Sequence, residues 1–281
     1  MIKALSEAEV RETVVSALAE DLGEGDITAA LVPETLRATA TVITREAGVL
    51  CGTAWFEMTF QAFDRDAAVE WKARDGDRIA PDQVLCTVSG TARALLSGER
   101  MALNFLQTLS GTATLARRYR EQVADLPVAL LDTRKTLPGL RAAQKYAVCC
   151  GGCSNHRMGL HDAILIKENH IAACGSIKKA VEKSQQLFPE LQVEVEVEDL
   201  DQLAQAVAAG AHLALLDNFT VQDLRRAVAL NQGRAVLEAS GGITLGNVRE
   251  IAETGVERIS IGALTKDVQA IDLSMRLRID R

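Results

Sequence analysis

Residues 132 to 170 hold the densest set of chemistry-bearing side chains in this 281-residue chain. The stretch contains three of the four histidines (His156, His161 and His170), and it has six lysines and arginines against three acidic residues. The whole chain has a formal net charge of −7, so a basic stretch needs a specific cause. Clefts lined with one sign of charge concentrate ligands of the opposite sign. We therefore interpret this stretch as a site for a small, highly anionic substrate.

Four basic residues of the stretch are suited to holding acidic groups. A guanidinium is a planar fork that matches a carboxylate or a phosphate, whereas an ammonium acts as a point charge. Any one of them alone would be explained as a surface charge or an ion pair, but four at strand ends and in a glycine-rich loop favour a shared anion site. These residues are Arg134, Lys135, Arg157 and Lys167.

Two acidic residues, Glu196 and Asp217, end neighbouring predicted strands. Their oxygens suit Mg²⁺, which usually keeps several waters and shares a substrate phosphate. The alternative is that they only pair with the lysines. Glu194 and Glu198 share the strand face of Glu196, because side chains alternate along a strand. We expect only some of the three glutamates to contact a ligand.

Glycine-rich segments follow the last two predicted strands, as Ser240-Gly241-Gly242 and Ser260-Ile261-Gly262. In β/α barrels the loops of the final strands often bind phosphate through backbone N–H groups, and glycine allows the close approach. Each segment alone is weak evidence, because glycine often ends strands for steric reasons. Together they predict a phosphate site. The chain has no Walker A pattern, which argues against P-loop nucleotide hydrolysis.

Six cysteines, in a chain of this length with no export signal at its start, are expected to be reduced thiols. One run has nearly the spacing of a zinc site. Two glycines within it indicate a turn, and it lacks the usual long loop between ligand pairs, so we favour the reading without zinc. The run is Cys150-x2-Cys153-x2-His156-x4-His161.

The elements that must position these residues are short aliphatic runs separated by helical patterns. Six runs predict strands at Val128–Leu131, Ala163–Ile166, Gln192–Val197, Leu213–Leu216, Ala235–Leu237 and Arg258–Ile261. Strands separated by helices imply right-handed crossovers and a parallel sheet. Six strands are fewer than the eight of a complete β/α barrel, whose strand ends converge on one face. We therefore expect an incomplete or distorted barrel.

The first half of the chain differs. It shows an opening helix at Ser6–Leu22, alternating runs at Ala38–Thr44 and Val69–Lys72, and a long helix from about Gly98 to Val123. Such alternation is typical of mixed or antiparallel strands. The expected α/β fold is thus an N-terminal α+β domain over residues 1–110 followed by an incomplete β/α barrel of about six parallel strands over 111–267. A helix-like tail, 268–281, returns to either domain.

Composition limits the classes of partner. The pI near 5.3 argues against a nucleic-acid partner, because binding the phosphate backbone needs a broad basic surface. The longest charge-free run, Met101 to Ala116, is too polar and slightly too short to span a bilayer. We expect a cytoplasmic protein that binds neither nucleic acid nor membrane.

Long ordered strings of these residues resemble the quinolinate phosphoribosyltransferase family, also called nicotinate-nucleotide pyrophosphorylase (carboxylating). The resemblance covers nearly the whole chain, and it implies an N-terminal α+β sandwich domain followed by an incomplete, open β/α barrel. It rests on EDLGEGDIT (Glu20–Thr28), GERMALNFLQTLSG (Gly98–Gly111), DTRKTLPGLR (Asp132–Arg141), NHRMGL (Asn155–Leu160), LIKENHI (Leu165–Ile171), EVEVE (Glu194–Glu198), LLDNF (Leu215–Phe219), EASGGI (Glu238–Ile243) and ISIGALT (Ile259–Thr265).

The resemblance implies a reaction between quinolinate and phosphoribosyl pyrophosphate that needs Mg²⁺ and no organic cofactor. The products are nicotinate mononucleotide, pyrophosphate and CO₂, in de novo NAD synthesis. It also implies a homodimer or a higher homo-oligomer, because Arg100 reaches into the site of a neighbouring subunit. Dimer and hexamer remain open.

The resemblance also implies a role for each site residue. Arg134, His156, Arg157 and Lys167 grip the two quinolinate carboxylates, Lys135 lies near the pyrophosphate, and Thr133 belongs to the substrate-binding set. Glu196 and Asp217 face the ribose and Mg²⁺, while Ser240, Gly241, Gly242, Ser260, Ile261 and Gly262 cradle the 5′-phosphate. The catalytic set is Lys135, Lys167, Glu196 and Asp217.

Two positions depart from the family pattern. Cys153 interrupts a glycine run before the NHR string, and Lys266 replaces a histidine of some relatives. A sister phosphoribosyltransferase acting on nicotinate, or a phosphometabolite-binding protein on the same barrel, are the competing hypotheses, since a fold does not fix a function. The basic cluster favours a dicarboxylate, and the intact acids argue against a binding protein.

Overall fold

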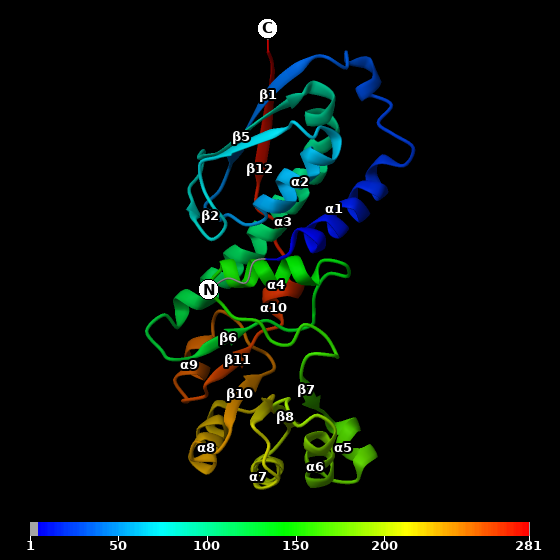
Figure 1. Cartoon of the computed structure of the whole chain (residues 1–281). Helices are drawn as coiled ribbons and strands as arrows, with labels where there is room; N and C mark the ends of the chain where they lie inside the picture. The colour runs from blue at the N-terminus through cyan, green and yellow to red at the C-terminus, as the bar shows by residue number, and fades with distance from the viewer. Residues whose placement is uncertain (1–4, 281) are drawn as a thin grey trace. The chain divides into compact units, whose positions relative to one another are not determined.

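The computed structural model describes residues 5–280, so residues 1–4 and 281 of the expected domain and tail ranges lie outside the described residues. The chain divides into two compact units. Unit 1 takes the chain up to Arg117, then Thr136–Gly152 and the end from Asp267; unit 2 takes Arg118–Lys135 and Cys153–Lys266. One long helix, α3 (Ala92–Gln122), runs from unit 1 into unit 2 (Figure 1). The domain division predicted near residue 110 falls inside this helix.

Unit 1 is built on an antiparallel sheet with the strand order β12-β1-β5-β3. Residues of β1 alternate between buried and more exposed, as its sequence predicts, and the buried ones pack with Phe56 and Phe60 of α2. A sheet covered on one face by helices is the α+β arrangement that the first half predicts. The strands are β1 (Arg37–Thr44), β3 (Ala68–Trp71), β5 (Val84–Thr91) and β12 (Leu273–Ile279), and α2 is Thr53–Phe63.

A second core in unit 1 joins its helices. Val14 of α1, Trp55 of α2, Leu109 of α3 and Ala147 of α4 belong to one buried cluster. The helix α1 begins after Ser6, whose side chain forms a reciprocal capping box with that of Glu9. The remaining elements are α1 (Glu7–Leu22), a 3₁₀ turn (Ala29–Leu31), α4 (Arg141–Cys150) and the paired short strands β2 (Gly48–Val49) and β4 (Arg78–Ile79).

The C-terminal segment forms a strand, so the helix-like tail expected for residues 268–281 is wrong. Strand β12 pairs antiparallel with β1. Leu273, Met275 and Leu277 recur at every second residue, which is the period of a strand, and all three pack in or against the core beneath the sheet. Pairing with a strand from the far end of the chain decides this conformation.

Unit 2 is a parallel sheet with the order β6-β11-β10-β9-β8-β7 in the part of the chain that the structure describes. Every strand lies where an aliphatic run predicts it. The edge strands β6 and β7 do not pair with each other within residues 5–280, so the barrel is open, as predicted. The strands are β6 (Ala129–Leu131), β7 (Ile164–Ile166), β8 (Val193–Val197), β9 (Leu213–Asp217), β10 (Val236–Ser240) and β11 (Arg258–Ser260).

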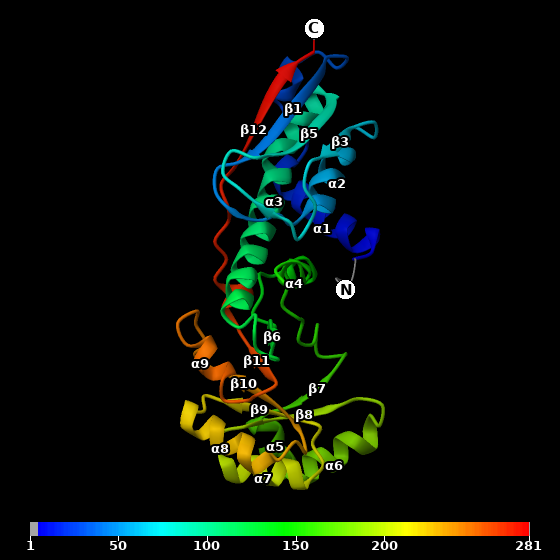
Figure 2. The same ribbon diagram turned by 90° about the vertical axis from the view of Figure 1, so that its left-hand side faces the viewer.

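Helices of unit 2 lie along one face of this sheet, and α6, α7 and α8 run side by side in both views (Figure 2). They leave the other face and the carboxyl ends of the strands to carry the polar side chains. The helices are α5 (Glu168–Cys174), α6 (Ile177–Leu187), α7 (Leu200–Ala208), α8 (Val221–Asn231), α9 (Val248–Ala252) and α10 (Ala263–Lys266). None of the helices within residues 5–280 combines the length and the apolar character needed to cross a membrane.

Candidate active site

The register of unit 2 brings the two predicted acidic ligands to the same face of the sheet. Glu196 of β8 lies opposite Leu215 of β9, and Asp217 follows Leu215 by two residues. Because alternate residues of a strand share a face, the carboxylates of Glu196 and Asp217 project from adjacent strands on one side. Asp217 accepts a hydrogen bond from Asn218 Nδ2 at 2.8 Å.

Lys167 directly follows β7 and its Nζ forms an ion pair with Glu196 Oε2. Its backbone N–H donates to His170 Nδ1 at 3.0 Å, which fixes the start of α5. The Lys167 side chain is 42% exposed, so its ammonium stays accessible to a ligand, whereas the Glu196 side chain is 14% exposed. An anion that binds beside Lys167 would therefore contact an ammonium group that Glu196 already holds in place.

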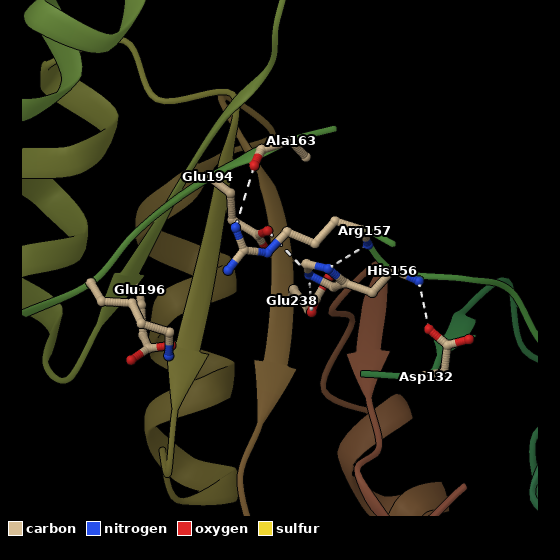
Figure 3. Close-up of polar contacts among 8 residues, drawn as sticks. Asp132, His156, Arg157, Ala163, Glu194, Glu196 and Glu238 are labelled. Atoms are coloured by element: carbon tan, nitrogen blue, oxygen red, sulfur yellow. Dashed lines mark hydrogen bonds and ion pairs between the residues drawn. The ribbon is translucent and has the colours of Figure 1, made fainter. Parts of the chain in front are cut away.

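Arg134 and Arg157 place two like charges near each other. Burial lowers the pKa of Arg157, and the positive charge of Arg134 lowers it further. The Nη1 of Arg157 donates to the carbonyl of Ala163 over 3.4 Å (Figure 3), and the Nε of Arg134 is buried with no hydrogen-bond partner among residues 5–280. A carboxylate between them would relieve the repulsion and accept from the unpaired N–H.

The loop that carries His156 and Arg157 is anchored by Asp132, for which the sequence predicted no role. The Asp132 side chain is fully buried at the end of β6. It accepts hydrogen bonds from Asn155 Nδ2 at 2.6 Å and from the backbone N–H of His156 at 2.9 Å (Figure 3). An acid directly after an aliphatic strand was the available signal for this role.

His156 lies between two buried glutamates. Its Nε2 is 3.2 Å from Glu194 Oε2 and 3.3 Å from Glu238 Oε1, and its Nδ1 accepts from the backbone N–H of Arg157 at 2.8 Å (Figure 3). Burial by itself lowers the pKa of His156, but hydrogen bonding to both glutamates and their charges outweigh burial and raise it to about 9. Burial also raises the pKa of Glu194. The hydrogen bond to His156 lowers that pKa, and the negative charge of Glu238 raises it further.

The raised pKa of His156 favours a ring that is protonated on both nitrogens. This conflicts with the hydrogen bond that Nδ1 accepts from the backbone N–H of Arg157. A second ring proton on Nδ1 would point at the N–H of Arg157, which already donates there. Because the pKa of Glu194 is raised, its carboxylate can hold that proton in place of Nδ1. Glu238 was not predicted as a site residue; its signal was a single acid inside an otherwise apolar strand, Val236–Ser240.

Glycines follow β10 and β11, and their lack of side chains leaves the backbone at these strand ends accessible to a ligand. Gly241 has φ +96°, and a Cβ there would lie 2.1 Å from Asn218 Oδ1, so any other residue would be strained and would displace the Asn218 side chain. Gly242 has φ +61° with nothing within 4 Å of its Cβ position. A Cβ on Gly262 would lie 3.2 Å from Lys135 Cδ, which places this glycine against the lysine.

The residues beside these glycines divide into two kinds. Ile261 is buried and its N–H donates to the carbonyl of Leu131 at 2.8 Å, so this N–H is engaged within the sheet rather than directed at a ligand. Ser260 is buried with no hydrogen-bond partner for its Oγ. Thr133 Oγ1 accepts from the backbone N–H of Lys135 at 3.1 Å, and so shapes the turn after β6.

Other residues considered in the sequence belong to unit 1. Arg141 and Lys145 are residues of α4, and Lys145 is 1% exposed. Arg100 is an exposed residue of α3 in unit 1, and its predicted reach into a neighbouring subunit remains a prediction.

The zinc-like run divides between two different donor groups. The Cys150 thiol lies with Cys51 and Asp75, whereas His156 lies with Glu194 and Glu238. Cys153 is buried in unit 2, and Lys266 is exposed at the end of α10. The spacing therefore reflects two local structures rather than one ligand set.

Comparisons with known proteins cover both units. The family model for the C-terminal domain of quinolinate phosphoribosyl transferase matches residues 112–276, and the N-terminal domain model matches residues 26–110. The nicotinate-nucleotide pyrophosphorylase (carboxylating) of Mycobacterium leprae is 42% identical over 95% of this chain and 96% of its own. The probable enzyme of the same name from Bacillus subtilis is 41% identical over 91% of this chain and 89% of its own.

A solved structure agrees with the sequence matches. The nicotinate-nucleotide pyrophosphorylase from Francisella tularensis superposes with a TM-score of 0.93 at 44% identity, over 99% of each chain. The match spans the sandwich and the barrel together. This chain belongs to the quinolinate phosphoribosyl transferase family.

Proposed function

We propose that this protein is a quinolinate phosphoribosyltransferase (decarboxylating). It joins quinolinate to phosphoribosyl pyrophosphate and releases nicotinate mononucleotide, pyrophosphate and CO₂, in de novo NAD synthesis. The observation that carries the proposal is that the charges of Arg134 and Arg157 interact, which lowers the pKa of Arg157, while the Nε of Arg134 is buried and unpaired within the described residues. Two such guanidiniums, with Lys167 on the same sheet, suit a substrate with two carboxylates.

The first bond change takes place at C1 of the ribose. The lone pair of the pyridine nitrogen forms the new N–C1 bond while the C1–oxygen bond to pyrophosphate breaks, and the electron pair leaves with pyrophosphate. Positive charge develops on the ribose, so the carboxylates of Glu196 and Asp217 stabilise it where it forms. Lys135, held beside Gly262, offsets charge on the departing pyrophosphate.

Decarboxylation follows from the alkylated ring. The bond between the ring and the carboxylate beside the nitrogen breaks, CO₂ leaves, and the electron pair is stabilised by the cationic nitrogen. A proton then takes the place of CO₂ on that carbon. Arg134 and Arg157 contribute by orienting two anionic substrates that repel each other.

Glu196 and Asp217 would hold Mg²⁺, since both are carboxylates on one sheet face and only one oxygen of Glu196 pairs with Lys167. When bound, the ion supplies charge neutralisation on the pyrophosphate. We further propose a homodimer or higher homo-oligomer in which Arg100 serves a neighbouring site. We place the enzyme in the cytoplasm, although plant relatives from Arabidopsis thaliana and Nicotiana tabacum are named as chloroplastic and mitochondrial.

One experiment tests the proposal. Purified protein is mixed with phosphoribosyl pyrophosphate, Mg²⁺ and either quinolinate or nicotinate, and CO₂ and mononucleotide are followed. We expect both products with quinolinate only. Mononucleotide from nicotinate without CO₂ would assign the sister activity instead. Binding of phosphoribosyl pyrophosphate without turnover of either acid would assign a binding protein.

A further inference from the structure

Both ring nitrogens of His156 are engaged by the protein. The backbone N–H of Arg157 donates to Nδ1 at 2.8 Å, so Nδ1 acts as an acceptor. An acceptor nitrogen of an imidazole carries no hydrogen, which leaves the ring hydrogen on Nε2. This N–H points between Glu194 Oε2, at 3.2 Å, and Glu238 Oε1, at 3.3 Å. The ring therefore links two carboxylates to the main chain of Arg157.

The charge of Glu194 also acts on Arg157 and Arg258, whereas Glu238 acts on His156 and Glu194. Glu238 is 0% and Glu194 is 6% exposed, on strands that flank β9. Within the described residues, Glu194 Oε1 and both carboxylate oxygens of Glu238 are buried without a hydrogen bond of good geometry, so Glu238 Oε1 meets His156 Nε2 as an ion-pair contact at 3.3 Å. Burying a carboxylate without full pairing is costly, and an apolar side chain at either position would avoid the cost. Retaining both acids indicates a role beyond packing.

A metal ion would be a different explanation for this group. The ligand atoms of His156, Glu194 and Glu238 lie within 4.8 Å of one another, which is a spacing that a cation can bridge. A metal ligand needs the free lone pair of Nε2, however, and that nitrogen holds the ring hydrogen because Nδ1 is already an acceptor. The geometry therefore favours a shared hydrogen over a metal.

We propose that Glu194 and Glu238 are positioning residues for substrate recognition. They hold the Nε2–H of His156, and Nδ1 in turn sets the backbone N–H of Arg157 and so the direction of its guanidinium. The ligand is an aromatic dicarboxylate, one of whose carboxylates the guanidinium receives. This inference rests on the proposed function and adds the residues through which that site is organised.

The first test compares Glu238→Gln and Glu194→Gln with Glu250→Gln, an exposed residue of α9, as the matched control. Glutamine keeps the size but cannot hold the Nε2–H by charge. We expect each of the first two variants to raise the KM for quinolinate about 10- to 100-fold, the loss that a misplacement of about 1 Å can cause. The KM for phosphoribosyl pyrophosphate should change less than about twofold, and the control should match wild type.

The second test asks whether the glutamate acts through Arg157. Arg157→Lys removes the guanidinium fork, so adding Glu238→Gln to it should weaken quinolinate binding, measured by calorimetry, by less than about twofold. Coupled residues show such non-additivity, whereas independent ones add. Additive losses, or an equal rise in KM for both substrates, would overturn the proposal.

The third test needs no turnover. With ¹⁵N-arginine labelling, the amide resonance of Arg157 is identified by its loss in Arg157→Lys. It should shift in Glu238→Gln and Glu194→Gln and stay in place in Glu250→Gln. An unchanged resonance, or stoichiometric metal lost on substitution of Glu238, would overturn the inference. Wild-type protein that fails to turn over quinolinate would refute the proposed function alone, because the resonance still reports the link.

Discussion

Replacing Arg157 with methionine is expected to remove most of the catalysis and leave the fold intact. The pKa of Arg157 is lowered in the folded protein, first by burial and then by the charge of Arg134. A base whose folded-state pKa is lowered favours the unfolded state while it is charged. The Arg157→Met variant loses that unfavourable charge, and the methionine occupies a similar length of side chain.

The magnitudes follow from the contacts of Arg157. In the folded state its side chain makes one long hydrogen bond, 3.4 Å to the carbonyl of Ala163, so its loss costs about 1 kcal/mol at most. Relief of repulsion in a partly solvated group is of similar size once it is reduced by screening. We expect the free energy of unfolding to stay within about 1 kcal/mol of wild type. Losing one partner of a carboxylate pair costs about 2–5 kcal/mol, or roughly 30- to 4,000-fold in kcat/KM.

Two measurements decide the case. Urea denaturation gives the free energy of unfolding, and initial rates at saturating phosphoribosyl pyrophosphate give kcat/KM for quinolinate. Arg157→Lys serves as the control that keeps the charge without the fork, and should fall between wild type and Arg157→Met. Near-normal kcat/KM in Arg157→Met would refute the assigned role. A loss of unfolding free energy beyond about 2 kcal/mol would show that Arg157 is structural.

Three further predictions concern the phosphate loop, acid stability and the metal. Gly241→Ala should lower the melting temperature more than Gly242→Ala, because only the first adds a methyl group 2.1 Å from Asn218 Oδ1. Equal melting temperatures would contradict this. Both variants should raise the KM for phosphoribosyl pyrophosphate. The bidentate Arg249 lowers the pKa of Asp125 to about 2, so the pair stabilises the fold above the ordinary aspartate pKa and is lost as pH falls to about 2. Melting curves of Asp125→Asn should therefore fall less steeply than those of wild type between about pH 4 and 2. Dialysis against EDTA should abolish turnover until Mg²⁺ is returned, and residual full activity would argue against the metal.

The barrel could be predicted from the sequence because its strands are buried. Runs such as Leu213–Leu216 are continuously aliphatic, as strands of a parallel sheet are when both faces are covered. Since parallel strands bring their carboxyl ends to one edge, the polar residues after them had to lie close together. The ion pair between Lys167 and Glu196 follows from that logic.

The error over the C-terminal tail has a physical cause. The tail became β12 because it pairs with β1, and no local pattern within 268–281 reveals a partner at the other end of the chain.

Glu238 illustrates the limit of reading acids one at a time. In the sequence it is a single carboxylate among aliphatic residues of β10, and only the fold brings it to the ring of His156. This arrangement explains how an acidic protein builds an anion site. Glu194 and Glu238 hold the ring of His156, and Glu196 pairs with Lys167, so each acid fixes a residue of the basic stretch. These side chains are thus fixed in place before the substrate binds, so the free energy of binding can be used to orient the two anions.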